Sequence, residues 1–301
     1  LERDVKIEED VKVYATCLGF GRDQAAVGAI PPDTITLTGA PNLWKKTTGK
    51  GVSIAVIDTG IAEHSDLRVK GGISTLGEVH TENFRDDNGH GTHVAGIIAA
   101  CGRDQGLLGM APDADLYAVK ALDRYGSGFV SDIIEGIAWA TEHRMNIVNL
   151  SLGTAEKSEA LRRAVRKAVA ASTILVAASG NSGGTGSPGV LYPAKFSEVV
   201  SVGSVDSDGK LSSYTSYGPE LNILAYGENI LSTYLNNSYR RESGTSMAAP
   251  QVSGALALLL GMGYRGSDAV RALLESAKKL DLPKEKQGSG LLNLAPFAQS
   301  Y

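Results

Sequence analysis

The 301-residue chain contains 43% hydrophobic residues and 36 glycines, and its formal net charge is -4. A chain of this length can bury roughly three quarters of its unfolded surface, so we expect one large core. The weak negative charge, with no long run of lysine or arginine, excludes the basic surface that nucleic acid requires. No apolar stretch approaches the roughly 20 residues that cross a bilayer, so we expect no membrane span.

Short, continuously apolar and often β-branched runs recur along the chain, and such runs are typical of strands buried on both faces of a sheet. They cover residues 52–57, 116–121, 147–152, 173–178, 199–205 and 221–224. Helical patterns occur at residues 131–144, 158–171, 246–262 and 267–279. The alternation of strands and helices predicts an α/β fold with a parallel sheet.

Functional residues of parallel α/β sheets gather at the carboxyl ends of strands, where loops and helix N-termini meet. Asp58 ends the first apolar run, and residues 151–153 and 180–181 follow two later runs. We therefore expect these three positions to lie at one edge of the sheet.

Three strings supply a carboxylate, an imidazole and a hydroxyl in the order Asp, His, Ser. Asp58 lies in VIDTG, His90 in NGHGTHVAG, and Ser246 in GTSMAAP at the start of a predicted helix. A serine hydroxyl needs a base to accept its proton, and imidazole suits that role near neutral pH. The order and the flanking residues resemble the three signature motifs of the subtilase family.

The resemblance implies a three-layer sandwich with a mainly parallel central sheet flanked by helices, and a serine endopeptidase acting through an acyl-enzyme. Ser246 is then the nucleophile, His90 the general base and Asp58 the residue that orients the imidazole. Asn181 matches the family's side-chain donor, and with the backbone N–H of Ser246 it would form an oxyanion hole. His93, about one helical turn beyond His90, is predicted to pack or hydrogen-bond locally.

Two strings of small residues are predicted to bind an extended peptide as an added strand. They are Gly126, Ser127 and Gly128, and Ser151, Leu152 and Gly153. By resemblance, Leu122, Val130, Ile133 and Leu152 would line an apolar pocket several residues upstream of the scissile bond. Core packing explains these four side chains equally well.

Leu191 stands where the floor of the family's main specificity pocket usually has a glycine. A leucine there would fill space, so the pocket is predicted to prefer smaller or differently shaped side chains over large aromatic ones. Ser182 replaces the acidic residue that some relatives carry at the pocket rim. We therefore expect no pronounced affinity for basic side chains.

Residues 101–107 keep the length of the family's strong calcium loop, and Asp66 matches its carboxylate ligand. Arg103 stands where an asparagine ligand is usual, so an ion pair between Arg103 and Asp66 is predicted to replace calcium. Structural calcium at Asp66 stays possible but doubtful, and catalysis is expected to require no cofactor. The resemblance also brings Cys17 near Cys101, so these two cysteines form either one disulfide or two separate thiols.

Residues 1–16 are predicted to be an N-terminal extension or a remnant of the propeptide, followed by one catalytic domain at 17–301. The string VKIEEDV at residues 5–11 is similar to the last strand of the family's inhibitory propeptide. The chain's own propeptide is thus expected to act as inhibitor and folding aid, and a disordered charged tail is the alternative.

The resemblance further implies protein or peptide substrates and a monomer. Because the chain begins at Leu1 and not at methionine, any signal peptide or upstream segment is expected to have been removed or left out of this sequence. Secretion is the expected location, with an intracellular location as the alternative.

Other functions compete with this one. The string GNSGG at residues 180–184 fits the nucleophile elbow of lipases and esterases, but that fold needs its histidine after the serine, and all five histidines precede Ser182. A zinc hydrolase using His90 and His93 lacks the HExxH string. A non-catalytic peptide-binding relative and a transpeptidase acting through the same acyl-enzyme stay open.

Overall fold

A seven-stranded sheet forms the centre of the computed structural model, which describes residues 8–18, 23–24, 32–103, 106–183 and 189–299. The strand order is β11, β10, β9, β7, β3, β5, β4, and every neighbouring pair is parallel. The strands are β3 (Ser53–Asp58), β4 (Val69–Ser74), β5 (Asp115–Lys120), β7 (Ile147–Leu150), β9 (Ile174–Ala178), β10 (Val200–Val205) and β11 (Ile223–Tyr226). The predicted α/β class is confirmed.

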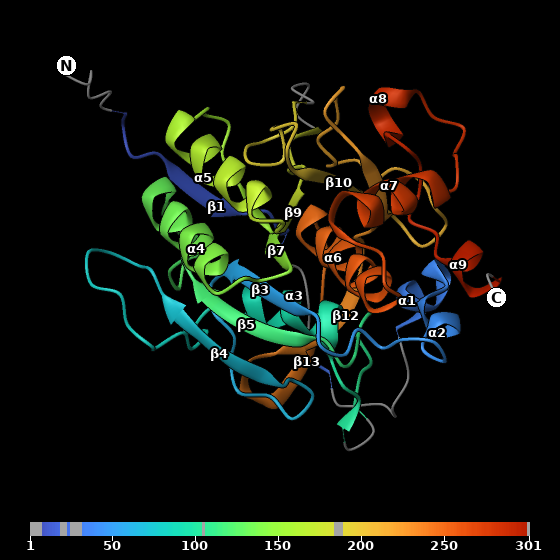
Figure 1. The fold of residues 1–301 in the computed structure, drawn as a ribbon, viewed down its shortest axis with the longest axis horizontal. Helices are drawn as coiled ribbons and strands as arrows, with labels where there is room; N and C mark the ends of the chain where they lie inside the picture. The colour runs from blue at the N-terminus through green and yellow to red at the C-terminus, as the bar shows by residue number, and fades with distance from the viewer. Residues whose placement is uncertain (1–7, 19–22, 25–31, 104–105, 184–188, 300–301) are drawn as a thin grey trace.

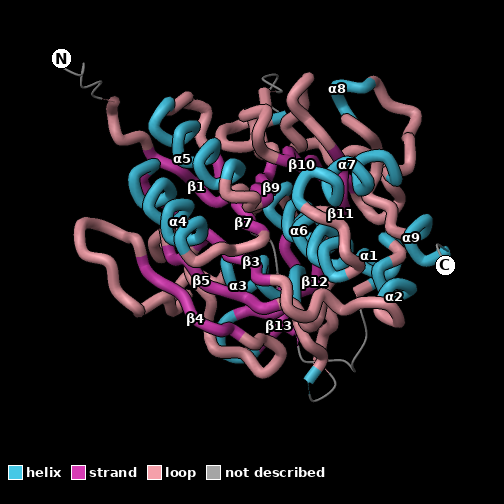
Figure 2. Tube along the Cα trace, viewed as in Figure 1, coloured by secondary structure: helices cyan, strands magenta, loops and turns pink. Residues whose placement is uncertain are grey.

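Helices cover both faces of this sheet, which is therefore the middle of three layers (Figure 1). On one face lie α4 (Val130–Glu142) and α5 (Glu159–Ala170). On the other lie α3 (His90–Ala99), α6 (Thr245–Gly261) and α7 (Gly266–Ser276). Figure 2 shows the central strands enclosed between these two groups of helices. Shorter helices are α1 (Asp33–Thr38), α2 (Ala40–Leu43), α8 (Lys284–Gln287) and α9 (Ala295–Gln299), with a 3-10 turn at Leu235–Asn237.

Strand β3 shows why the central strands are continuously apolar. Ile54 and Val56 belong to the core beneath α3 and α6, whereas Ala55 and Ile57 belong to the core beneath α4 and α5. All four side chains are fully buried. Successive residues of a strand point to opposite faces, so a strand covered on both faces needs an apolar residue at every position.

The edge strand β4 is missing from the sequence prediction, although the six predicted strands all belong to the sheet. Its string, VKGGIS, contains a lysine and two glycines, and most of its residues are only partly buried. An edge strand does not need the continuous apolar run on which the prediction depended.

Helix α6 is apolar on all sides because it is buried between the sheet and its neighbouring helices. Among the helices in the described ranges, none alone is long and apolar enough to cross a membrane. Helices α6 and α7 together have the length and hydropathy of a membrane span, but a bend of 118° separates them.

Two smaller sheets complete the fold. One contains β1 (Lys12–Ala15) between β6 (Ser127–Phe129) and β8 (Leu152–Gly153). The other contains β12 (Ile230–Tyr234), β13 (Ser238–Glu242) and β2 (Asp23–Gln24). Strand β1 thus fills a gap between two strands that come from distant parts of the chain.

The order in which the chain adds strands to the sheet changes direction at β3. From β3 the chain first adds β4 and β5 on one side, and then adds β7, β9, β10 and β11 on the other. In open α/β sheets, sites lie outside the carboxyl ends of strands at such a switch point. Asp58 ends β3 and Ser151 directly follows β7, so both residues lie at this edge.

Candidate active site

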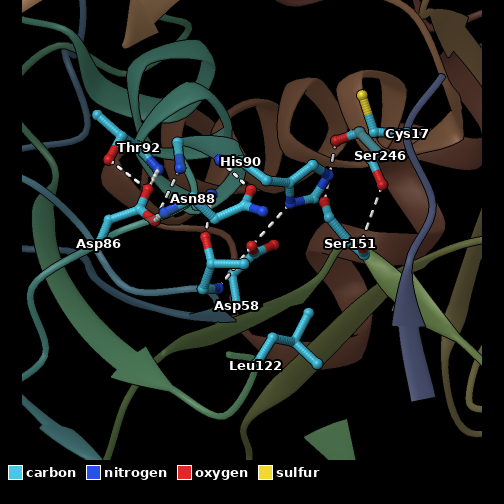
Figure 3. Close-up of polar contacts among 12 residues, drawn as sticks. Cys17, Asp58, Asp86, Asn88, His90, Thr92, Leu122, Ser151 and Ser246 are labelled. Atoms are coloured by element: carbon cyan, nitrogen blue, oxygen red, sulfur yellow. Dashed lines mark hydrogen bonds and ion pairs between the residues drawn. The ribbon is translucent and has the colours of Figure 1, made fainter. Parts of the chain in front are cut away.

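Asp58, His90 and Ser246 come together at the carboxyl edge of the central sheet (Figure 3). Asp58 is the last residue of β3, His90 the first of α3, and Ser246 the second of α6. Nδ1 of His90 lies 2.7 Å from Oδ1 of Asp58, which is fully buried. The carboxylate holds the proton on Nδ1, so Nε2 is left as the basic nitrogen.

The glycines around His90 allow α3 to approach β3 closely. A Cβ atom at Gly91 would lie 2.1 Å from the carbonyl oxygen of Gly60. The start of the helix is fixed by Asp86, whose carboxylate accepts hydrogen bonds from the backbone of Gly89 and Thr92. Local sequence thereby places the imidazole beside Asp58.

Opposing effects determine the pKa of His90. Burial would lower it, but the Asp58 carboxylate, with smaller contributions from Glu242 and Asp86, raises the pKa above the ordinary value of 6.5. The imidazolium that forms during proton transfer is therefore stabilised by its surroundings.

Catalysis is expected to slow as the pH falls through this raised pKa, because a protonated His90 cannot accept the proton of Ser246. The acid limb of kcat/KM should lie above the ordinary imidazole pKa of about 6.5. Initial rates on an uncharged peptide between about pH 5 and pH 9 measure it. A flat profile down to about pH 5 would contradict this role of His90.

The Ser246 hydroxyl is bonded to groups other than His90 in this structure. It donates to the carbonyl oxygen of Ser151 at 2.8 Å and lies 2.7 Å from the hydroxyl oxygen of Thr16. Within the described ranges, Nε2 of His90 has no hydrogen-bond partner. Proton transfer from Ser246 to His90 would therefore require the serine hydroxyl to turn toward Nε2.

Asn181 and the backbone of Ser246 converge on one carbonyl oxygen, that of Thr16. Nδ2 of Asn181 donates to it at 2.7 Å and the N–H of Ser246 at 3.2 Å. Gly244 keeps the space open, since a Cβ atom there would lie 2.6 Å from the same oxygen. The two donors predicted to form an oxyanion hole are thus aimed at the same point.

Thr245 is a residue of the site that the sequence analysis missed. Its N–H and its hydroxyl both donate to Oδ1 of Asn181, at 3.0 and 2.9 Å. These bonds fix the amide so that Nδ2 points toward the cleft. The sequence feature that could have indicated this role is the position of Thr245 directly before Ser246.

The small-residue strings bind an extended segment, and that segment is the chain's own β1. Strand β1 pairs antiparallel with β6 and with β8. The pairing continues past the strand, because Ala15 N–H donates to Gly126 O at 2.9 Å and Thr16 N–H to Ser151 O at 3.2 Å. All six residues of the two strings therefore lie along residues 12–16.

Comparison with known proteins identifies the family. Residues 49–290 match the model described as the subtilase family, Peptidase_S8. The chain belongs to the subtilase family. It is 46% identical over 253 residues to a thermostable alkaline protease of Halalkalibacterium halodurans, covering 83% of this chain and 68% of that protein. It is 45% identical over 255 residues to subtilisin DY of Bacillus licheniformis, covering 83% and 92%.

A third relative is the minor extracellular protease Epr of Bacillus subtilis, which is 49% identical over 217 residues. That match covers 72% of this chain and 33% of the relative. Together with the family match, these relatives show that the chain is a serine endopeptidase.

The β1 segment contacts two regions of this subtilase that were predicted to bind substrate side chains. Val13 is 1% exposed and joins the buried cluster that contains Leu122, Val130, Ile133 and Leu152. The buried side chain of Thr16 lies next to the predicted specificity pocket, where Leu191 packs against Gly153 and Gly180. A Cβ atom at Gly180 would come within 2.7 Å of the Leu191 side chain, so these two residues are in tight contact. Residues 184–188 of the neighbouring loop lie outside the described residues.

The second histidine of the subtilase motif, His93, is structural. Its Nε2 lies 3.0 Å from the carbonyl oxygen of Ile230 and 2.9 Å from that of Arg240. Burial lowers the pKa of His93, which keeps the ring neutral. His93 therefore joins α3 to β12 and β13 instead of serving the reaction.

The predicted ion pair between Arg103 and Asp66 is wrong. Oδ2 of the buried Asp66 accepts hydrogen bonds from the Tyr239 hydroxyl at 2.8 Å and from the Leu107 N–H at 2.6 Å, whereas Arg103 is exposed. The sequence could not show this, because Tyr239 is 173 residues away in the chain.

The structural calcium that the family implies at Asp66 stays a prediction. Oδ2 of Asp66 is occupied by these two hydrogen bonds, whereas its buried Oδ1 has no hydrogen-bond partner within the described residues. A Cβ atom at Gly106 would lie 2.0 Å from Asp66, so the loop backbone packs closely against this carboxylate. Among the described residues, which leave out loop positions 104–105, no group of three or more His, Cys, Asp or Glu side chains could hold a metal ion.

The possible disulfide between Cys17 and Cys101 is also wrong, since both cysteines are free. Cys17 lies in the cleft and donates to Oε2 of Glu242 at 3.3 Å. Cys101 instead forms a backbone bridge with Leu108. The prediction placed Cys17 beside the 101–107 loop, but the chain from β1 holds it at the active site.

Proposed function

We propose that this subtilase uses Ser246 as nucleophile, His90 as general base and Asp58 to orient the imidazole, with Asn181 and the Ser246 N–H stabilising the oxyanion. The observation that carries the proposal is the position of the Thr16 carbonyl oxygen, which accepts hydrogen bonds from both donors. In acyl transfer, this is the position that the negatively charged oxygen of the tetrahedral intermediate takes.

In the proposed reaction, Oγ of Ser246 attacks the carbonyl carbon while Nε2 of His90 accepts its proton. The imidazolium, stabilised by Asp58, then gives this proton to the leaving amine as the peptide bond breaks. A water molecule, deprotonated by His90, attacks the resulting ester, and the imidazolium returns this proton to Oγ of Ser246 as the ester bond breaks. These steps need no cofactor besides the protein's own groups.

Replacing Asn181 with leucine is expected to lower kcat by about 10²- to 10³-fold with little change in KM, because the amide acts on charge that develops in the transition state. Thr245→Val should cause a smaller loss through misorientation of the amide, and Thr245→Ser, which keeps the hydroxyl, should restore activity. Steady-state kinetics on one peptide separate these effects. An increase in KM alone for Asn181→Leu would contradict the assignment.

We also propose that residues 1–16 are an N-terminal extension that inhibits the enzyme and aids its folding, as a propeptide does, and that residues 17–301 form the catalytic domain. The bond presented to Ser246 is the one between Thr16 and Cys17, so the proposed boundary coincides with the proposed cleavage site. Residues 1–7 lie outside the described residues.

Contacts outside the cleft support a specific role for the extension. Glu8 accepts hydrogen bonds from the Ser158 hydroxyl at 2.9 Å and the Ala160 N–H at 3.2 Å, and these bonds lower the pKa of Glu8. Asp10 accepts bonds from the N–H and hydroxyl of Ser131 at 3.0 and 2.6 Å. Both carboxylates lie at the N-terminal ends of α5 and α4, where the helix dipole favours negative charge. A disordered tail would not make such contacts.

Substrates are proposed to be proteins or peptides that bind as residues 13–16 do. The pocket holding Val13 favours an aliphatic side chain three residues before the residue at which the chain is cut. The packing of Leu191 favours a small side chain, such as that of Thr16, on the residue that supplies the carbonyl group of the cleaved bond. We further propose that the enzyme is secreted, which the Bacillus subtilis relative named as extracellular supports, and that it acts as a monomer.

A fluorophosphonate probe tests the catalytic proposal. Peptide mapping by mass spectrometry should find the label on Ser246, and N-terminal sequencing of incubated protein should give a chain that begins at Cys17. A folded protein that takes up no label would support a non-catalytic peptide-binding function instead. Formation of a new peptide bond with an added amine would support transpeptidation.

A further inference from the structure

The cleft continues beyond Thr16 on the side that holds the leaving part of a substrate. Figure 3 shows Cys17 beside Ser246, at the end of the segment that contains β1. The next residue, Leu18, donates its N–H to the carbonyl oxygen of Ser243 at 2.8 Å. This side of the cleft is therefore lined by the end of β13 and the residues that lead to α6.

The side chain of Cys17 meets the carboxylate of Glu242, the last residue of β13. The thiol donates to Oε2 at 3.3 Å. Burial and the nearby carboxylate raise the pKa of the thiol, so it stays protonated and can donate. The first side chain after the bond presented to Ser246 thus faces an acceptor.

Glu242 is ionised although it is buried. Its side chain is 6% exposed, and Nε of Arg240 lies 4.0 Å from Oε1. Burial opposes ionisation, but neighbouring groups, among them the Cys17 thiol and the Arg240 guanidinium, lower the pKa of Glu242. A buried carboxylate with a cation at this distance still has lone pairs to offer to a substrate.

We propose that Glu242 selects the substrate residue that follows the cleaved bond. It favours a side chain that donates a hydrogen bond or carries positive charge, and it disfavours aspartate and glutamate, whose charge would be buried against its own. This inference rests on the proposed catalytic function, because only that function makes Cys17 the first residue after the bond.

Peptides of sequence VYATXLG test the proposal, with X as serine, lysine, valine or aspartate. The wild-type enzyme should cleave the serine and lysine peptides with a kcat/KM at least about 10-fold above that of the aspartate peptide, with valine between them. In Glu242→Gln the ratio of serine to aspartate should fall below about 3-fold, because the repelling charge is gone. Ratios on one enzyme cancel any effect of Glu242 on the pKa of His90.

Glu285→Gln is the matched control, since Glu285 is exposed in α8 and the change removes the same charge. This variant should keep the wild-type ratios. An unchanged ratio in Glu242→Gln, or a wild-type enzyme that prefers aspartate, overturns the proposal. Cleavage of the valine peptide by Glu242→Gln shows that the variant is folded. Failure of the catalytic proposal is distinguishable, because then no peptide is cut and no probe labels Ser246.

Discussion

Replacing Ser246 with alanine is expected to lower kcat by about 10⁶-fold, the order found when the serine of a subtilisin triad is removed. The variant loses the atom that attacks the carbonyl carbon, whereas both donors to the oxyanion remain. Residual hydrolysis should therefore exceed the reaction in water alone. The same variant should retain an intact bond between Thr16 and Cys17, measured by intact mass and by cleavage of an added peptide.

Ser243→Ala is a suitable control for this variant. Ser243 lies three residues before Ser246, and its hydroxyl accepts a hydrogen bond from the N–H of Asn229 instead of contacting the triad. Its contact with Leu18 uses the backbone carbonyl, which alanine keeps. This control should cleave peptides at close to the wild-type rate. Self-cleavage by Ser246→Ala at a rate near that of the wild type would refute the role of Ser246.

Asp58→Asn is expected to lower kcat by about 10⁴-fold while leaving the fold intact. The asparagine amide can donate to Nδ1 of His90, which moves the proton to Nε2 and leaves no base facing Ser246. The variant also loses the charge that raises the pKa of His90, so its acid limb should move to lower pH. Rates across the pH range, together with thermal unfolding, measure both effects.

Asp113→Asn provides the matched control for that substitution. Asp113 is a surface carboxylate, paired with Arg68 at 2.6 Å and remote from the triad. Its loss should cost less than about 1 kcal/mol of stability and leave kcat unchanged. A loss of less than about 10-fold in Asp58→Asn would show that Asp58 does not control the tautomer.

The central strands were predictable because their environment imposes one simple pattern. Burial on both faces requires apolar residues at every position, as Ile54 to Ile57 show for β3. Strand β4 has a single neighbour in the sheet and is only partly buried, so its glycines and lysine are tolerated and the pattern disappears. The smaller sheets depend on pairing between distant segments, which local periodicity does not encode.

The catalytic candidates were predictable for a different reason, since each lies in a short string of unusual composition. What the strings could not give is which groups surround them in space. Thr245 fixes Asn181, and Glu242 faces Cys17, through contacts that only the folded chain creates. The disulfide failed because the expectation placed the N-terminal residues beside the 101–107 loop as in relatives. The ion pair failed because the distant Tyr239 donates to the Asp66 carboxylate.

The position of β1 indicates which segments of a protein substrate can bind in the cleft. Removing it would leave β6 and β8 as two facing edges, each with unpaired backbone groups, and a gap one strand wide between them. Only a segment that can adopt an extended conformation over at least four residues can fill that gap. Helices and paired strands in a folded protein cannot do so without local unfolding, so loops and unfolded chains are the natural targets. The stability of a target protein, as much as its sequence, then decides where it is cut.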